Sequence, residues 1–439
     1  MKSQVHQYFN KNNPKLLLLN IAYVLFLFAF IFKLVNILLV TDWNNTYSFS
    51  DSFINYQGGF IRRGLMGEIL YFFAVHFNFN VEWTVKILAL ICFSALCIFF
   101  VRFFIKKGYT LYILPLCFFL GAPVLNNESL IRKDSLMMCF FIGIFFIFNK
   151  NNFSKIVKVL IINILAIIII FIHETFVFFS FPLLLILFWN LYREKGYLKS
   201  IVLSVISLLP GIMAFILMMS MQGTMETAQT IWDSWLGIIY KEPSNVRWDT
   251  ALGAIGWETI PTIKSHLIQN FMAIKSNISS LVVHCFVFPV IYYIATNALL
   301  VFRKNEKDFT NKDKKVLSSI FIFQLISLLP LFTLLSCDYA RLIFYWTTSS
   351  FAVFLLVPAN EIESLIPKFF ARFIDFINNN ITVILRPTKT TLVFLMMFIG
   401  ISPYSLFIDK VVSSTMIYNV LFTLSAPMVI LKKLFFYFI

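Results

Sequence analysis

Long apolar segments alternate with short polar segments along almost the whole chain. Several of the apolar runs approach or exceed the ~17–20 residues that a helix needs to cross a ~30 Å hydrocarbon core. The pattern predicts an all-α fold, a polytopic transmembrane helical bundle of about 12 spans that forms a single integral membrane domain over 1–439. The expected spans are 16–40, 84–104, 108–124, 135–149, 157–172, 175–191, 200–220, 279–302, 315–336, 342–358, 392–408 and 412–431.

Three segments do not fit a simple alternation of spans and connectors. Segment 65–80 is apolar but short and carries Glu68 and His76, so we expect it to lie along the outer surface without crossing. Segment 221–278 is polar enough to fold as one large extracytoplasmic loop, and it contains four tryptophans. Segment 360–391 mixes phenylalanines and isoleucines with charges, which predicts an amphipathic interfacial helix on the cytoplasmic side. The four tryptophans are Trp232, Trp235, Trp248 and Trp257.

The distribution of charge sets the expected orientation. The net charge is +15, but the basic residues form short clusters between apolar runs, which is typical of topology-setting loops and not of a nucleic-acid surface. With a cytoplasmic N-terminus, 24 of the 36 lysines and arginines fall on inner segments. Both termini are therefore expected in the cytoplasm. The six cysteines lie within or at the ends of apolar runs and indicate neither a disulfide framework nor a metal site.

Polar constellations interrupt the apolar pattern, and this topology places all of them on the outer side. Ionisable groups at membrane depth are costly and are functional by default. Convergence of several such groups on one face is harder to explain by packing than a single ion pair. The constellations are Asp42 with Asp51, the turn Gly58-Gly59-Phe60-Ile61-Arg62-Arg63-Gly64, Glu128 with Arg132-Lys133-Asp134, His173-Glu174, the 221–278 loop, and Asp338 with Arg341.

Arg62 and Arg63 stand on the side that positive charge normally avoids. Arginine binds phosphate through two parallel hydrogen bonds, so a diphosphate ligand would explain this placement. The alternative is that both side chains extend to lipid head groups without any further role. For Asp338 and Arg341, about one helical turn apart, the alternatives are a mutual structural pair and a contact with substrate.

His173-Glu174 separates two almost wholly apolar runs with only a two-residue polar junction. A carboxylate beside an imidazole provides a general base, and burial is expected to raise the pKa of Glu174 towards neutrality. Asp51 is the third candidate for the catalytic base, and a purely structural pair is the alternative for His173-Glu174. No metal motif is present, and the carboxylates would hold a divalent ion only if folding brought them together. No metal and no cofactor are expected.

These motifs together resemble those of bacterial O-antigen and capsular polysaccharide polymerases. The similarity lies in the acidic first outer loop, the Gly-Gly-Phe-Ile-Arg-Arg-Gly turn, the Arg-Lys-Asp loop, His-Glu at a span end and the late Asp-Tyr-Ala-Arg. The resemblance covers most of the chain in architecture, but only some 25 residues in motif.

The resemblance implies a class C-type glycosyltransferase of the bacterial inner membrane with its active site facing the periplasm. It would move a growing glycan from one undecaprenyl diphosphate to the sugar of another, without a cofactor. A chain-length regulator and a flippase are the implied protein partners, and no nucleic acid is expected. The expected catalytic residues are Glu174, His173 and Asp51; the expected substrate-binding residues are Arg62, Arg63, Arg132, Asp134, Arg247, Asp338 and Arg341.

Three other classes of membrane protein remain as alternatives. A transferase that uses a lipid monophosphate-sugar would look nearly the same, although it commonly has an adjacent acidic pair where Asp42 and Asp51 are nine residues apart. A polysaccharide transporter or flippase would need ionisable groups on both sides or at the midplane. A membrane O-acyltransferase would need a histidine facing the cytoplasm. Glycosyl transfer agrees best with cations, carboxylates and aromatics gathered on the outer face.

Overall fold

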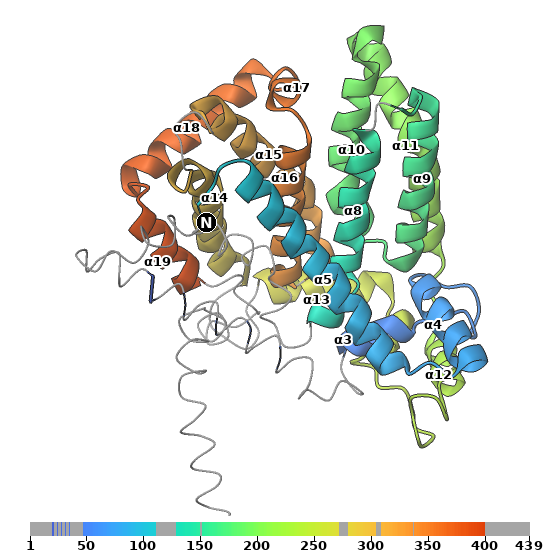
Figure 1. Ribbon diagram of the computed structural model, residues 1–439. Coiled ribbons are helices and arrows are strands. Elements are labelled where there is room, and N and C mark those ends of the chain that lie inside the picture. The colour runs from blue at the N-terminus through green and yellow to red at the C-terminus, as the bar shows by residue number, and fades with distance from the viewer. Residues whose placement is uncertain are drawn as a thin grey trace, which may run out of the picture.

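The described part of the chain is entirely helical apart from its connecting segments. The computed structural model describes residues 47–110, 129–149, 152–271, 280–303, 309–336 and 338–399, with a few single positions between 20 and 35. No strand is present in these ranges (Figure 1). The helices are α3 (Tyr47–Ser50), α4 (Gly64–Phe77), α5 (Val81–Lys106), α8 (Asp134–Phe148), α9 (Lys155–Ile172), α10 (Phe176–Tyr192), α11 (Tyr197–Ser220), α12 (Met225–Ser234), α13 (Thr259–Phe271), α14 (Ser280–Val301), α15 (Asn311–Pro330), α16 (Tyr339–Leu356), α17 (Ala359–Glu363), α18 (Lys368–Ile384) and α19 (Lys389–Ile399).

Local sequence signals define where several of these helices begin. The side chain of Asn80 accepts a hydrogen bond from the backbone N–H of Trp83 at the start of α5. Ser154 caps α9 in the same way, and Thr310 with Asp313 forms a capping box on α15. Such caps satisfy backbone N–H groups that have no partner inside the helix.

Five described helices are long and apolar enough to cross a membrane: Val81–Lys106, Lys155–Ile172, Phe176–Lys195, Tyr197–Ser220 and Asn311–Leu335. The prediction of a helical membrane protein is confirmed at this level. Helix α4 has 14 residues, about 21 Å at 1.5 Å per residue, which falls short of a ~30 Å hydrocarbon core and agrees with a segment that does not cross. The expected spans 16–40, 108–124, 392–408 and 412–431 lie wholly or mostly outside the described residues.

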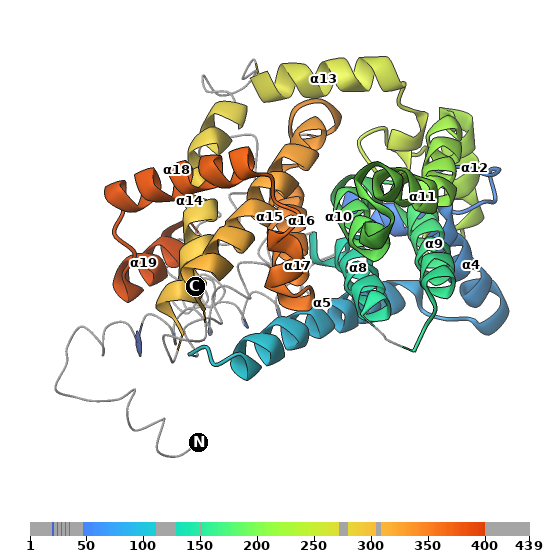
Figure 2. The ribbon, with the colours of Figure 1, turned by 90° about the horizontal axis from the view of Figure 1, so that it is seen from above.

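We name the two ends of the bundle by the two ends of helix α10. At the site end α9 ends and α10 begins; at the far end α10 ends and α11 begins. Helices α9, α10 and α11 are seen nearly end-on in Figure 2, whereas α13 and α18 lie across the view. Helix α13 packs on Leu331–Leu335 at the site end, and α18 packs on the first turns of α15 at the far end.

The predicted amphipathic helix is present as α18. Phe369 and Phe376 are exposed on it, whereas Ile374 is fully buried. An ion pair of 2.6 Å between Lys315 Nζ and Asp375 Oδ2 ties it to α15. Among the described residues, therefore, no part of the protein covers these two phenylalanines of its apolar face.

Candidate functional site

The turn that precedes α4 holds two arginines in fixed backbone positions. Gly59 has φ +113°, a conformation that L side chains rarely adopt, and a Cβ at Gly64 would lie 2.2 Å from the ring of Tyr56. Arg63 is left-handed with φ 67°, which costs a non-glycine residue roughly 1–2 kcal/mol. The backbone N–H of Arg62 donates to the carbonyl of Met221 at 3.1 Å. The surrounding contacts therefore hold Arg63 in a strained position.

Arg63 is paired with Glu174, 111 residues further along the chain. Its Nε lies 3.0 Å and 2.9 Å from the two carboxylate oxygens, and Nη2 donates to Oε1. The side chains are 19% and 9% exposed, so this is a largely buried ion pair. Both oxygens of Glu174 are therefore already engaged by a guanidinium group.

This pairing overturns the expected chemistry of Glu174. Burial by itself would raise the pKa of Glu174, but the charge of Arg63 outweighs it and holds that pKa well below its usual range. The prediction of a carboxylate tuned towards neutrality is wrong. Sequence reasoning recognised the burial of Glu174 but had no means of finding its cationic partner. A carboxylate in this state positions Arg63 better than it accepts a proton.

His173 is neutral in this environment. Burial, and then the charge of Arg63, lower its pKa to about 3. Its Nδ1 accepts a hydrogen bond from the backbone N–H of Thr175 at 3.2 Å, which leaves the ring proton on Nε2. The Thr175 hydroxyl lies 2.9 Å from the same nitrogen. The imidazole thus acts as a fixed neutral group at the start of α10.

Lys133 lies at the centre of the site and was absent from the predicted site residues. It is 1% exposed, and its Nζ donates to the carbonyl oxygens of Arg63 at 3.2 Å and Ile172 at 3.4 Å. The same nitrogen lies 3.8 Å from Asp51 Oδ1. Its position inside the Arg-Lys-Asp motif was the only sequence signal for this role.

Asp51 is a buried carboxylate of the site, and one of its oxygens carries no hydrogen bond. Its Oδ1 is buried and has no hydrogen-bond partner. Burial alone would raise its pKa, but the charges of Lys133 and Arg63 lower it to about 2. Asp51 is therefore ionised at neutral pH and retains a lone pair for a hydrogen-bond donor.

Two motifs more than 200 residues apart pair crosswise. Arg132 Nη1 donates to Asp338 Oδ2 at 2.8 Å, and Arg341 donates through Nε and Nη2 to the two oxygens of Asp134 at 2.8 Å and 2.7 Å. The hydroxyl of Tyr345, one turn after Arg341, also donates to Asp134. The expected pair within Asp338 and Arg341 is only a 3.9 Å contact, because each side chain has a closer partner in the Arg-Lys-Asp motif.

Cations outnumber carboxylates in this cluster. Its members are Asp51, Arg62, Arg63, Arg132, Lys133, Asp134, Glu174, Asp338 and Arg341, five cations against four carboxylates. Arg62 is the cation for which the described residues provide no ion-pair partner, and burial lowers its pKa. In the Arg63–Glu174 and Arg341–Asp134 pairs the cation is the more exposed member. In the Arg132–Asp338 and Lys133–Asp51 pairs the carboxylate is the more exposed member, so an approaching anion would meet a guanidinium group first only at Arg63 and Arg341.

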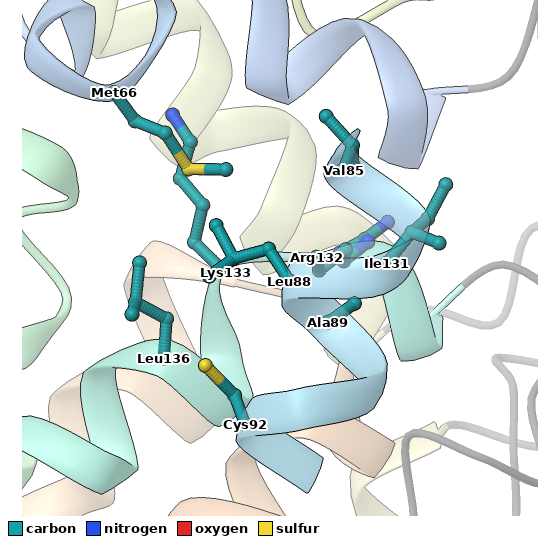
Figure 3. A pocket seen from close by; sticks show the side chains of 9 residues that line it. All are labelled: Met66, Val85, Leu88, Ala89, Cys92, Ile131, Arg132, Lys133 and Leu136. Atoms are coloured by element: carbon teal, nitrogen blue, oxygen red, sulfur yellow. The ribbon is translucent and has the colours of Figure 1, made fainter. Parts of the chain in front are cut away.

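A small cavity lies beside the cluster between α4, α5 and α8. It measures about 10 Å³, close to the volume that holds one water molecule. Figure 3 shows Met66, Leu88 and Cys92 on its walls together with Arg132 and Lys133. The Lys133 side chain extends towards Met66 in this view, while Arg132 is directed to the other side.

The predicted outer loop folds onto the cluster. Trp235 is fully buried and donates from Nε1 to the carbonyl of Phe53 at 2.9 Å. The backbone N–H of Ala251 donates to Ser50 Oγ at 3.0 Å, next to Asp51. The loop therefore forms one side of the site.

The structure brings together nearly all the site residues that the sequence predicted. Arg247 is the exception, because its side chain pairs with Asp249 on the exposed surface of the loop. Asp42 and Glu128 lie outside the described residues. Among the described residues no group of three or more histidines, cysteines or acids could hold a metal ion. Comparisons of the chain with protein-family models, with curated proteins and with solved structures find no match.

Proposed function

We propose that this protein is a glycosyltransferase that polymerises oligosaccharide repeat units carried on undecaprenyl diphosphate, at the outer face of a bacterial inner membrane. The observation that carries the proposal is the excess of cations in the cluster at the site end, where Arg62 forms no ion pair with any of the described residues. A half-buried guanidinium group with no carboxylate of its own among the described residues favours an anionic ligand. A ligand with a lipid tail would bring its phosphates to the depth at which this cluster lies.

The proposed reaction needs no nucleotide, because the diphosphate leaving group carries the activation. The acceptor hydroxyl attacks the anomeric carbon, the bond from that carbon to the phosphate oxygen breaks, and the diphosphate leaves with the electron pair. Arg62, assisted by Arg63 and Arg341, stabilises the negative charge that develops on the leaving oxygen. The hydroxyl proton goes to Asp51, because its Oδ1 carries no hydrogen bond whereas both oxygens of Glu174 are bound to Arg63. Cations hold the pKa of both carboxylates low, so the choice between them rests on this difference in hydrogen bonding.

The test replaces Arg62 in cells whose only copy of the protein is the variant. We expect Arg62→Lys to shorten the surface polysaccharide and Arg62→Gln to leave mostly single repeat units on the lipid, since lysine keeps the charge but not the paired hydrogen bonds. Arg372→Lys and Arg372→Gln on α18, at the far end, are the matched controls. Protein levels in the membrane fraction show whether each variant is inserted.

A normal polymer ladder from Arg62→Gln cells would refute the proposal. A lipid monophosphate-sugar donor is the closest alternative, and it is distinguished with purified protein. Undecaprenyl diphosphate should raise the thermal midpoint of the wild type more than undecaprenyl phosphate does, and this difference should vanish in Arg62→Gln.

A further inference from the structure

The four tryptophans of the outer loop have different roles. Trp232 stacks on Tyr240 with ring centroids 3.6 Å apart, and Trp235 is fully buried. These two belong to the core of the loop. Trp248, by contrast, is 70% exposed. An exposed indole offers a flat apolar face on which the ring of a ligand can stack.

The turn that carries Trp248 is rigid. Thr250 donates from its backbone N–H and from Oγ1 to the carbonyl of Arg247, at 3.2 Å and 2.7 Å. The indole Nε1 of Trp257 donates to the carbonyl of Trp248 at 3.0 Å. A Cβ at Gly253 would lie 2.3 Å from the Arg247 carbonyl oxygen, so the two backbones are in close contact. Binding to Trp248 would therefore cost little ordering of the backbone.

The neighbours of Trp248 favour a hydroxyl-rich ligand over a lipid surface. Arg247 and Asp249 flank it, and they pair with each other through Nε–Oδ1 at 3.0 Å and Nη2–Oδ2 at 2.7 Å. The pair is neutral as a whole and exposed, so its remaining N–H groups and lone pairs are open to a polar ligand. Lys241 and Glu242, which precede the turn in the chain, are also exposed.

The turn lies close to the charged cluster. Trp248 is three residues before Ala251, whose N–H is bound to Ser50, the neighbour of Asp51. Three residues span at most about 11 Å of backbone. A sugar stacked on Trp248 would thus lie near a reaction centre at Asp51.

From these observations we infer that the Arg247–Thr250 turn binds the saccharide chain, with a sugar ring stacked on Trp248 and its hydroxyls on Arg247 and Asp249. This inference rests on the proposed function and adds the place where the glycan is held during polymerisation.

The test measures binding to the full-length protein in nanodiscs of zwitterionic lipid. The probe is the water-soluble polysaccharide released by mild acid from cells that carry the protein. We expect Trp248→Ala to weaken binding roughly tenfold, equivalent to ~1.4 kcal/mol, and Trp248→Phe to weaken it much less because a ring remains. Trp83→Ala, which removes another half-exposed tryptophan at the start of α5, is the matched control and should bind as the wild type does. In cells, Trp248→Ala should give shorter chains without stopping the first transfer.

Equal affinity of Trp248→Ala and wild type would overturn the inference. So would quenching of Trp248 fluorescence by brominated lipids, because the indole would then be a membrane anchor. The inference and the proposed function can fail separately. If Arg62→Gln cells make normal polymer but binding still depends on Trp248, only the transferase proposal is refuted. If Arg62→Gln cells lose the polymer but Trp248→Ala binds as the wild type does, only the glycan site is refuted.

Discussion

The Arg63–Glu174 pair gives the sharpest test of how the site is built. Glu174→Gln keeps the shape of the side chain but removes the charge that compensates Arg63. Removal of one partner of a buried ion pair costs roughly 3–5 kcal/mol. Arg63 is 19% exposed and an amide oxygen still accepts one hydrogen bond, so we expect the lower end, about 3 kcal/mol.

The double variant separates a pairwise interaction from two independent effects. Arg63→Gln should cost about 3 kcal/mol for the same reason, because it leaves a buried carboxylate unpaired. Arg63→Gln with Glu174→Gln should then cost less than either single change, and far less than the sum of about 6 kcal/mol, since no unpaired charge remains. The free energy of unfolding is measured for the purified protein by titration with SDS in mixed micelles, followed by helical circular dichroism.

An exposed ion pair provides the matched control. Lys155 and Glu194 are 3.5 Å apart with side chains 49% and 81% exposed, so Glu194→Gln should leave the free energy of unfolding unchanged. Additive losses in the double variant, or a Glu174→Gln protein as stable as the Glu194→Gln protein, would show that the pair does not hold the Arg63 turn.

Three further changes test other parts of the site. The pKa of His173 falls from about 6.5 in the unfolded chain to about 3 in the folded protein. The free energy of unfolding should therefore be fully retained above pH 6.5 and fall with the pH below it, by up to ~1.4 kcal/mol per pH unit. His173→Gln should lack this dependence when unfolding is measured at several pH values. Gly64→Ala should cost about 1–3 kcal/mol through its clash with Tyr56, whereas Gly143→Ala, with nothing within 4 Å of a Cβ, should not, as SDS titration can check. Asp134→Asn should lower the unfolding free energy by about 3 kcal/mol in the same titration, because a buried guanidinium loses its carboxylate.

Much of the fold could be predicted because lipid restricts the chain to helices. Apolar length alone predicted α9, α10 and α11 to within a few residues. The segment 65–80 forms the helix α4, and its position along the outer surface stays a prediction. The helices inside the polar loop, α12 and α13, were not predicted. Their apolar residues are too few to stand out from loop sequence, and packing onto the site end stabilises them.

The members of the site could be predicted, but their partners could not. Charge inside an apolar chain is conspicuous, so His173, Glu174 and the Arg-Lys-Asp motif were identified from sequence. The pairing of Arg132 with Asp338 spans 206 residues, and no local spacing reports it. The pKa of Glu174 was predicted to shift in the wrong direction for the same reason. The effect of burial can be inferred from the local sequence, whereas the charge of Arg63 comes from a distant segment.

The energetic cost of the cluster is itself an argument about function. Well-packed hydrophobic residues of similar volume are often neutral or stabilising by about 1–4 kcal/mol relative to a buried ion pair. At the site end, nevertheless, Arg63 is strained in the left-handed region, Lys133 is fully buried, and a buried oxygen of Asp51 has no hydrogen bond. At the far end, the pairs Lys315–Asp375 and Lys312–Glu363 are more exposed, and Lys314 is the buried charge there, bound to the Asn297 side chain. Stability gives no reason for gathering most of the costly groups at one end of an apolar bundle, whereas the proposed binding and reaction of a charged, lipid-linked substrate there would.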